Sequence, residues 1–577
     1  MRHKCLPSIS CTRSRAIFVY LLVVASLSLT LPRVGRSQTI KDVATDATDP
    51  GNLADTEPSI AVDPSDPLRI AIVSFSENWG GGVRAPVWMS TDGGATWSKI
   101  LIIPQPPTGF AGPGDQKIAF DSSGRVLIAE LDAGFDDFVY RQTGAPGTPL
   151  TAGASYGNDQ PHLDIDKTAA SPCFNRVYSP WLNTAAAPAR SNVERSSDFG
   201  GTVTAVPAGD PAFNNRTTRI AVAPNGRAYI IYKTREGAID ANFETAHFRV
   251  ERSDDCGATW NGLGATGVAV HSGTVATWFT NNFGNPAKGK VGRARSSDAW
   301  ISVDRASGDI YAVFCNRDAS GFGQIFLARS TDQGATWSNT RVTDGTHHSA
   351  YPEVAVAANG TIGVLYIDFD DSGAATIFRH RLARSFNHGT SWTQSNLQSM
   401  NPAGLANASS GFLWGDYEGI TAEGNQFYGV FTGQSIGRTT LQLDPIFFTA
   451  PATQFSFPNI CKLHPQICVI GPIARCQIFG CLIIFPICEV TDCPVCRGGG
   501  CLIDLIIDQV SDPWRVTVFD PKGNVVKAQQ VRKGDRITMR FSVSQEFASR
   551  VSEYSVGFKG GRPGTALNAS IQAKAIH

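Results

Sequence analysis

Short apolar runs separated by polar turns recur along most of this 577-residue chain. Each copy has an apolar strand, a polar turn and a second strand. The seven first strands are Pro58–Asp63, Gln116–Asp121, Pro161–Asp166, Arg219–Ala223, Ala299–Asp304, Pro352–Val356 and Asp416–Ile420. Their nearly continuous apolar character is typical of strands that are buried on both faces. The pattern therefore predicts a series of β-hairpins, each with one inner strand.

A second motif alternates with these hairpins and predicts a tight turn. Its pattern is Ser-x-Asp-x-Gly-x-Thr-Trp, with clear copies at Ser90–Trp97, Ser253–Trp260 and Ser330–Trp337, a variant at Ser385–Trp392 and an incomplete copy at Ser196–Gly200. Short Ser and Asp side chains hydrogen-bond to nearby backbone groups, and the glycine tolerates a positive φ. The tryptophan can bury its apolar face between neighbouring sheets. We expect each motif to join the third and fourth strands of a four-stranded sheet.

Four-stranded sheets repeated around a channel form a β-propeller, in which radial closure protects most strand edges. The two motifs resemble the BNR/Asp-box repeats of the sialidase-like superfamily over roughly two thirds of the chain. The resemblance implies a propeller whose Asp boxes lie on the rim opposite the active face. The number of inner hairpins favours seven blades. Six remain possible, because sialidases have six and the second copy has no Asp box.

The chain is expected to be all-β and to have four parts. Residues 1–37 have the pattern of a signal peptide, with a basic leader, an apolar run from Ala16 to Leu31 and small residues before Gln38. Residues 38–455 form the predicted propeller, 456–501 a cysteine-rich connector and 502–577 a small β-sandwich-like domain. We expect a protein that is secreted, periplasmic or on the cell surface, with no stable membrane span after signal cleavage. An uncleaved anchor is the alternative.

Charge and cysteine content narrow the classes of function. Lys+Arg and Asp+Glu number 50 each, so no overall electrostatic field favours nucleic acid, and we expect no nucleic-acid partner.

Eight cysteines between Cys461 and Cys501 predict disulfides in an exported protein, with zinc as the alternative. The three others beyond the leader, Cys173, Cys256 and Cys315, are odd in number, so at least one should be free or paired elsewhere. We expect no cofactor and no metal ligands.

Candidate functional residues lie around the inner strands, because the starts of these strands should surround the mouth of the central channel. Carboxylates there can act as acids and bases, and guanidinium groups can bind anions. The candidate catalytic residues are Asp159, Asp298, Tyr351, Glu353 and Asp416, and the candidate substrate-binding residues are Arg219, Arg235, Arg317, His162, Trp414 and Tyr417. The alternative for each of them is a structural role, in a loop or between blades.

The resemblance implies glycan chemistry, which in sialidases uses three arginines, a tyrosine nucleophile assisted by a glutamate, and an aspartate acid/base. The family's Phe/Tyr-Arg-Ile-Pro motif near the first blade is absent, since the first inner strand begins Glu57-Pro-Ser-Ile. We therefore expect a secreted sialidase-like propeller that acts on or binds glycans through its central mouth, without true sialidase activity. An enzyme of this kind would be glycoside hydrolase-like. The alternatives are a non-catalytic propeller that binds a protein or another polar extracellular ligand, and an assembly factor built on a related propeller.

Overall fold

The computed structural model describes most of the propeller region and the strands that follow it. The described residues are 38–48, 55–76, 85–103, 114–131, 137–145, 147–157, 159–238, 243–276, 278–279, 294–295, 299–370, 377–401, 417–453, 468–470, 485–486, 501–508, 514–519, 525–532, 537–543, 555–560 and 568–575. The predicted signal peptide, the candidates Asp298, Trp414 and Asp416, and the side chains of the cysteine cluster lie outside this description.

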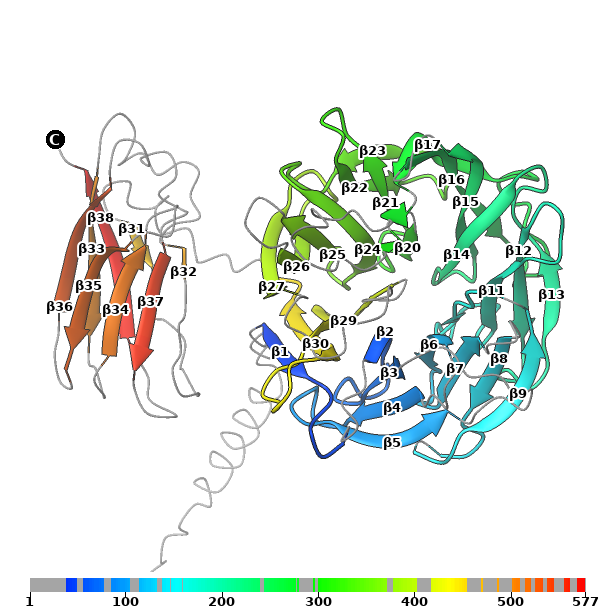
Figure 1. Ribbon diagram of the computed structural model, residues 1–577, viewed down its shortest axis with the longest axis horizontal. Helices are drawn as coiled ribbons and strands as arrows, with labels where there is room; N and C mark the ends of the chain where they lie inside the picture. Colours follow the sequence, from blue (N-terminus) through cyan, green and yellow to red (C-terminus); the bar gives the residue numbers. More distant parts are fainter. Residues whose placement is uncertain are drawn as a thin grey trace, which may run out of the picture. The chain divides into compact units, whose positions relative to one another are not determined.

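Seven blades of four strands are arranged in a ring around a central channel (Figure 1), and the pairing of Val275 with Asn316 joins the fourth and fifth blades into one continuous sheet. The first three are β2–β5 (Asp55–Val62, Ile70–Ser76, Ala85–Ser90, Ser98–Ile103), β6–β9 (Gly114–Phe120, Val126–Leu131, Asp137–Arg141, Thr151–Tyr156) and β10–β13 (Asp164–Ile165, Val177–Asn183, Arg190–Ser196, Thr204–Pro207). The next three are β14–β17 (Asn214–Val222, Ala228–Ala238, Phe243–Ser253, Val268–Ala276), β20–β23 (Trp300–Val303, Ile310–Arg317, Gly323–Ser330, Ser338–Arg341) and β24–β27 (His348–Val356, Ile362–Asp370, Ile377–Ser385, Thr393–Met400). The predicted seven-bladed propeller is confirmed, and the six-bladed alternative is wrong.

The seventh blade is assembled from both ends of the propeller sequence. It contains β28 (Gly419–Glu423), β29 (Gln426–Gln434) and β30 (Leu443–Pro451), and its outer strand is β1 (Thr39–Asp42). β1 pairs antiparallel with β30, from Thr39 opposite Thr449 to Asp42 opposite Ile446. This pairing closes the ring and covers the edge of β30 that would otherwise be open.

The blades pack face to face, and each interface is an apolar core. Between the seventh and first blades, Ile60, Ile72 and Val430 are buried in one such cluster. Trp97 of the first Asp box packs against the same cluster, with its ring 5.0 Å from that of Phe447. The tryptophan of an Asp box therefore joins neighbouring blades, as the motif predicts.

The Asp boxes form identical hydrogen-bonded turns. In the box at Ser330–Trp337, the Gly334 N–H donates to Ser330 Oγ (2.8 Å) and the Thr336 N–H donates to Asp332 Oδ1 (2.9 Å). The incomplete copy repeats this arrangement, since the Gly200 N–H donates to Ser196 Oγ at 2.9 Å. The side chains of the boxes are thus occupied by their own turns.

The boxes lie on the same rim as the hairpin turns that end the inner strands. In the first blade the Gly93 N–H of the box donates to the Leu68 carbonyl of the inner hairpin (2.9 Å). In the fourth blade Arg227, in the inner turn, pairs with Asp254 of the box at 2.6 Å. The starts of the inner strands are at the other end of the channel, so the boxes are far from any chemistry placed there.

One disulfide connects two neighbouring blades. Cys173, in the turn between β10 and β11, is bonded to Cys256 in the Asp box of the next blade. Cys315 on β21 is not part of this disulfide, and its buried thiol donates to the Ser349 carbonyl at 3.3 Å. The prediction that at least one of these three cysteines is free or paired elsewhere is confirmed.

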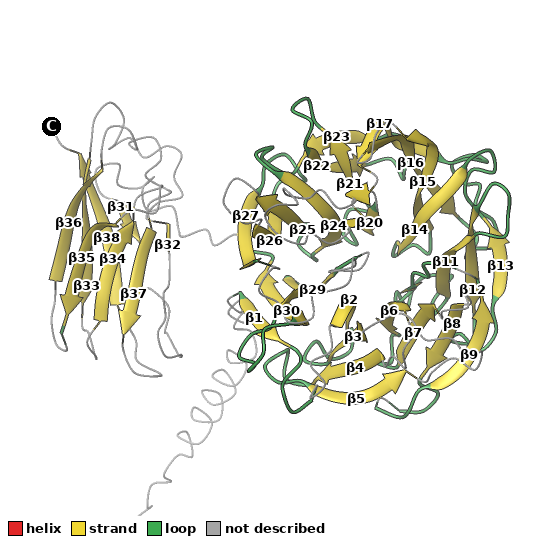
Figure 2. Cartoon of the chain, viewed as in Figure 1, coloured by secondary structure: helices red, strands yellow, loops and turns green. Residues whose placement is uncertain are grey.

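The chain divides into two compact units, Met1–Thr453 and Gln454–His577. The described strands of the second unit form two four-stranded sheets. One contains β31 (Cys468–Ile470), β38 (Asn568–Ala575), β33 (Cys501–Asp508) and β36 (Ile537–Val543), and the other β32 (Phe485–Pro486), β37 (Ser555–Gly560), β34 (Trp514–Phe519) and β35 (Val525–Val531). Figure 2 shows that the elements drawn in both units are strands and loops. Among the described residues, no helix is long and apolar enough to cross a membrane.

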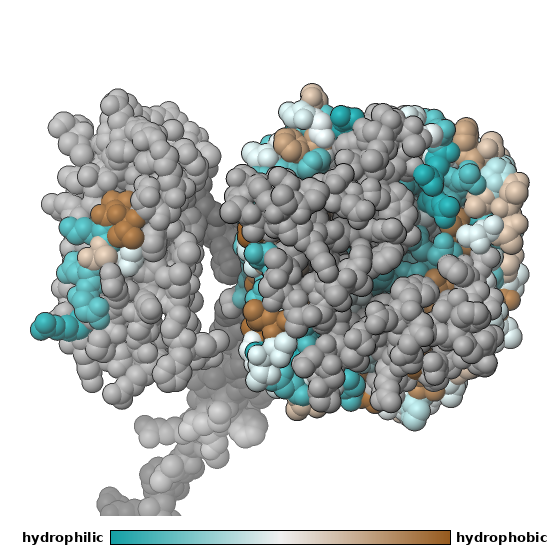
Figure 3. Space-filling view, viewed as in Figure 1, coloured by the Kyte–Doolittle hydropathy of each residue, from teal (hydrophilic) through white to brown (hydrophobic). Residues whose placement is uncertain are grey.

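The described surface of the propeller carries few large apolar side chains. Those that are exposed include Leu68 in the first blade, Phe174 in the third, and Ile436 and Leu441 in one loop of the seventh. On the face drawn in Figure 3, the described hydrophobic residues are likewise scattered among hydrophilic ones. The central channel is therefore the most informative feature of the propeller.

Candidate functional site

The inner strands place one residue of each blade at the same height in the channel. In each blade this residue lies four positions before the first residue of the turn that joins the first two strands. We call these seven residues the polar ring. The polar ring consists of Ser59, Lys117, His162, Arg219, Trp300, Glu353 and Gly419. Five of these side chains are polar or charged although the position is buried in every blade. Such side chains are costly to bury unless they have partners, so their contacts decide what the ring can do.

A backbone irregularity repeats just before the ring. In four blades the pairing of the first two strands shifts register there, for example between Thr56 and Ser59 and between Ala350 and Glu353. Two positions before the ring, the residue has a left-handed φ of 50–53° in five blades, namely at Glu57, Asp115, Gln160, Thr217 and Tyr351. Non-glycine residues adopt this conformation rarely and at a cost. The bulge turns these side chains and those of the ring toward one region at the start of the inner strands.

Two cations in this region lie against two aromatic rings. Lys117 Nζ is 4.6 Å from the centre of the Trp300 ring and 3.7 Å from that of Tyr417. The Arg219 guanidinium lies 4.9 Å and 5.5 Å from the same two rings. Lys117 is 4% exposed and Arg219 is 1% exposed. Four blades thus contribute to one buried cluster of cation–π contacts.

The carboxylate of Glu353 is the anionic partner of this cluster. Its Oε1 accepts the Glu418 N–H at 3.1 Å and its Oε2 accepts the Ile420 N–H at 3.3 Å, which joins the sixth and seventh blades. Burial raises the pKa of Glu353 to about 7, although Lys117 and Arg219 act to lower it. Burial also lowers the pKa of Lys117 to about 8, against the opposing effect of Glu353. Both groups can therefore exchange protons near neutral pH.

Tyr417 connects the seventh blade to the second. Its phenolic hydroxyl donates a 2.8 Å hydrogen bond to Asp115 Oδ1. Burial and the charges of Asp115 and Glu57 raise the pKa of Tyr417 well above its usual value. The phenol therefore stays protonated and serves as a hydrogen-bond donor, unlike the activated tyrosine that sialidase chemistry requires.

The His162 imidazole also belongs to this cluster, and it is uncharged. The imidazole makes an edge-to-face contact with Trp300, with the ring centres 5.0 Å apart. Burial and the charges of Lys117 and Arg219 lower the pKa of His162 well below its usual value. The imidazole is thus uncharged at neutral pH and can accept or donate a hydrogen bond.

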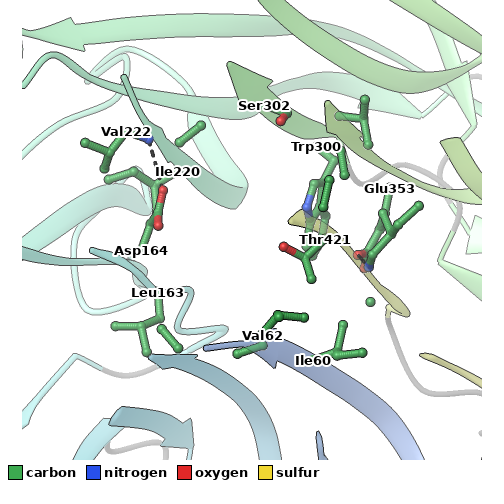
Figure 4. Close-up of a pocket in the computed structure, with 18 of the residues that line it drawn as sticks. Ile60, Val62, Leu163, Asp164, Ile220, Val222, Trp300, Ser302, Glu353 and Thr421 are labelled. Atoms are coloured by element: carbon green, nitrogen blue, oxygen red, sulfur yellow. Dashed lines mark hydrogen bonds between the residues drawn. The ribbon is translucent and has the colours of Figure 1, made fainter. Parts of the chain in front are cut away.

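A cavity of about 360 Å³ occupies the channel, with the polar ring at one end (Figure 4). Lys117, His162, Trp300 and Glu353 contribute to its lining. Next to the ring, each blade adds one aliphatic side chain, from Ile60, Ile118, Leu163, Ile220, Ile301, Val354 and Ile420. Asp164 also lines the cavity and accepts the Val222 N–H at 3.0 Å, as Figure 4 shows. Lys167, Arg305 and Glu423, near the inner turns, line the end away from the ring, so aliphatic walls lie between two charged ends. A concave space with aliphatic walls and a few polar groups is typical of small-molecule sites.

The structure brings together part of the set that the sequence predicts. His162, Arg219, Glu353 and Tyr417 all belong to or contact the polar ring. Tyr351 is buried in the apolar cluster that also contains Trp300 and Tyr417.

The other described candidates lie elsewhere. Asp159 is half-buried at the start of the third blade, where its carbonyl accepts the Leu182 N–H at 2.9 Å. Arg235 is half-buried near the end of β15, opposite Asn214 and Ala246, and Arg317 is exposed at the end of β21. Both arginines stand at the end of a second strand rather than in the polar ring.

Sequence reasoning missed four members of the polar ring, namely Ser59, Lys117, Trp300 and Gly419. All four occupy the same position of the repeat as His162, Arg219 and Glu353. An alignment of the inner strands on their turns would have identified them. Among the described residues, no group of three or more His, Cys, Asp or Glu side chains could hold a metal ion.

The fold and the site define a seven-bladed β-propeller with a buried acid–base cluster on its axis. No protein-family model matches the chain. The xyloglucanase Xgh74A of Acetivibrio thermocellus is 26% identical over 306 residues, which are 49% of this chain and 32% of that protein. The match thus spans about a third of the length of this relative.

Solved structures with a similar fold include several enzymes that act on carbohydrates. An ulvan lyase is 10% identical with a TM-score of 0.44, covering 72% of this chain and 96% of that chain. An α-L-arabinanase of Penicillium chrysogenum, complexed with arabinobiose, is 11% identical with a TM-score of 0.37, covering 73% and 99%. The microbial sialidase Hz136 is 14% identical with a TM-score of 0.35, covering 69% and 66%. At these low identities and TM-scores, the similarity concerns the propeller fold alone.

Proposed function

We propose that this protein is a carbohydrate-active propeller that binds a glycan at the polar ring and transfers protons to or from it. The observation that carries the proposal is that Lys117, which lies against Trp300 and Tyr417, and Glu353 are buried near enough to shift each other's pKa. The two groups have pKa values of about 8 and about 7, which bracket physiological pH. Perturbed acids and bases in a cavity on the axis of a fold are characteristic of functional sites.

The chemistry of each group suggests a role. Glu353 is the proton donor or acceptor, because an acid with a pKa near the working pH is the most efficient one. Lys117 is its charge partner and can carry a proton itself. Tyr417 and Arg219 supply hydrogen bonds and a permanent positive charge to a polar substrate. Since Tyr417 is not activated as a nucleophile, the proposal is general acid–base chemistry rather than the sialidase reaction.

The distant xyloglucanase relative suggests the first substrates to test. Its similarity covers about half of this chain, so xyloglucan and related neutral polysaccharides are reasonable candidates. A glycan substrate agrees with the export that the first 37 residues suggest, and we propose that the mature protein acts outside the cytoplasm. We propose that the second unit is a small β-sandwich-like domain for attachment.

The experiment that tests this function measures product formation and pH dependence together. The full mature chain is incubated with xyloglucan, other neutral polysaccharides and uronate-containing ones. New reducing ends report hydrolysis, and ultraviolet absorbance of unsaturated uronates reports elimination. Glu353→Gln should lower the rate at least about 100-fold, as removal of a general acid or base usually does. Exposed Ser338 lies on the outer strand β23, and Ser338→Ala should leave the rate unchanged.

A Lys117→Arg variant separates proton transfer from charge. Arginine keeps the positive charge but does not lose its proton in the working range of pH. If Lys117 carries a proton, this variant loses activity and the alkaline limb of the pH profile changes. If Lys117 supplies only charge, activity and profile are retained. No turnover of any polysaccharide by the folded wild-type protein would contradict the enzymatic proposal.

A second candidate function is binding without catalysis. It is favoured by the low exposure of Glu353, which is 2%, and by the use of both its oxygens in backbone hydrogen bonds between blades. A glycan array with the mature protein distinguishes the two functions. Specific binding with no product would assign the ring to recognition and blade packing.

A further inference from the structure

The ring of blades is closed by a single short strand. β1 has four residues, and its last residue, Asp42, is 6% exposed. Asp42 Oδ1 accepts the Ala44 N–H at 3.1 Å, and Asp42 Oδ2 accepts the Ile436 N–H at 2.7 Å. This side chain therefore ties β1 both to the segment after it and to the loop between β29 and β30.

A second carboxyl group lies directly against Asp42. Asp444 on β30 is fully buried, and its side chain is hydrogen-bonded to that of Asp42. Two carboxyl groups form such a bond only when one of them holds a proton. A proton shared by Asp42 and Asp444 would relieve the repulsion between two carboxylates at the seam where the ring closes.

The charged groups around the pair are few. Arg438, from the loop before β30, donates to both oxygens of Asp444 at 3.1 and 3.0 Å, and its side chain is 2% exposed. Its Nε also pairs with Asp46 at 3.2 Å, on the segment after β1. Asp46 itself is exposed. One buried arginine thus faces two buried carboxyl groups. Its hydrogen bonds go to Asp444, so its positive charge balances mainly the charge of Asp444.

We propose that Asp42 is a proton-operated latch, which holds β1 against the seventh blade when protonated and weakens the closure of the propeller when it loses its proton. When Asp42 has lost its proton, two carboxylates would lie side by side in a buried environment, where like charges repel strongly. Detachment of β1 would expose the edge of β30 and the side chains of Val43 and Ala44, which are both 1% exposed. The latch thus links the integrity of the ring to pH.

The direction of the pH effect follows from the two states of Asp42. In the closed form, burial and then the charge of Asp444 raise the pKa of Asp42 to about 8, from a usual value of 3.8. Closing β1 therefore binds a proton between these two pH values. The closure is strongest below about pH 4, weakens as the pH rises toward about 8, and changes no further above that.

Hydrogen exchange followed by mass spectrometry tests the latch on the full chain. The protection factors of peptides covering 39–48 and 443–451 are measured between pH 5 and pH 8.5. These factors correct for the pH dependence of intrinsic exchange. We expect protection to fall at least about tenfold across this range, in line with a change of one pKa unit or more. Peptides of the third blade should change much less.

Two variants make the test specific. Asp42→Asn preserves size and carries no titrating proton, so the pH dependence of protection at 39–48 should disappear. Asp46→Asn alters the exposed acid of the same segment and should keep that pH dependence. A flat profile in the wild-type protein, or an unchanged slope in Asp42→Asn, would overturn the proposal.

A spectroscopic measurement keeps the proposal falsifiable if Asp42→Asn does not fold. Infrared difference spectra of the wild-type and Asp444→Asn proteins are recorded at pH 6 and pH 9. Glu353 also loses its proton in this range, and it contributes equally to both proteins. We therefore expect the wild-type protein to lose more protonated carboxyl absorbance between pH 6 and pH 9 than Asp444→Asn does. An equal loss in the two proteins would refute a shared proton.

Discussion

The hydroxyl of Tyr417 donates a 2.8 Å hydrogen bond to Asp115, a residue 302 positions earlier in the chain. The two residues belong to the seventh and second blades, which are not neighbours in the ring. This bond therefore crosses the start of the channel and couples blades that share no packing interface. Polar groups there hold the ring together as well as forming the candidate site.

Removal of this hydroxyl should reveal both roles. Tyr417→Phe leaves the carboxylate of Asp115 without its donor in a buried place, which should cost about 1–3 kcal/mol of stability. Denaturant unfolding monitored by fluorescence measures this cost. Glycan turnover or binding per folded molecule should fall as well.

A matched tyrosine provides the control for this substitution. The Tyr232 hydroxyl donates to Glu251 Oε1 and to the Thr266 carbonyl, both at 2.9 Å, within the fourth blade. Tyr232→Phe should cost a similar amount of stability and leave glycan turnover or binding unchanged. Equal functional losses in the two variants would assign Tyr417 to structure alone.

Glu353 should make stability depend on pH in a definite direction. Its pKa is about 7 in the folded protein and near 4.5 when it is exposed, so folding binds a proton between these values. The stabilisation is complete below about pH 4.5 and is lost as the pH rises through about 7. Glu353→Gln removes this group, so the difference in unfolding free energy between wild type and variant should shrink from pH 4.5 to pH 7.

Denaturant unfolding at several pH values measures this difference. Asp254→Asn is a suitable comparison, because hydrogen bonds and the charges of Arg252 and Arg227 lower the pKa of Asp254 despite some burial. Asp254 is largely ionised from pH 4.5 to pH 7 in both states, so its variant should show little slope in this window. A constant gap between wild type and Glu353→Gln would mean that Glu353 is not perturbed.

The blades could be predicted from the sequence because their signals are local. The box at Ser330–Trp337 has its hydrogen bonds within five residues, so its pattern survives in any protein that forms the turn. The inner strands have continuous apolar runs because they are buried on both faces. The inner-strand signal repeats in each blade and gave the number of blades, and the box repeats in five of the seven.

The composition of the site could be predicted only in part, because its contacts are not local. Lys117 meets Trp300 and Tyr417 across the channel, and no spacing along the chain encodes this contact. Arg235 and Arg219 are both arginines of the fourth blade. Arg235, however, lies on the second strand, opposite Asn214, which precedes the ring residue Arg219 by five positions. The bulge that aims the ring residues is a backbone feature without a residue signature, since it occurs at Glu57, Thr217 and Tyr351 alike.

The Asp boxes should affect stability and not the site. Trp260 is 5% exposed and packs between the third and fourth blades, so Trp260→Ala should cost about 3–5 kcal/mol. Trp337 is half-buried, and its variant should cost less. Thermal unfolding and ligand binding are measured together on both variants. Loss of binding without loss of stability would place the box in the site.

The disulfide between Cys173 and Cys256 should be a major stabilising link between the third and fourth blades. It joins residues 83 positions apart, and a bond that closes a loop of this size typically contributes about 2–4 kcal/mol. Cys173→Ser with Cys256→Ser should lower the unfolding temperature, and a reductant should lower it in the wild-type protein by a similar amount. The double variant should then be insensitive to the reductant in this transition. Cys315 is buried and is not part of this disulfide, so Cys315→Ser should leave the response to the reductant intact. If the reductant shifts the double variant as much as the wild-type protein, the stabilisation comes from other cysteines.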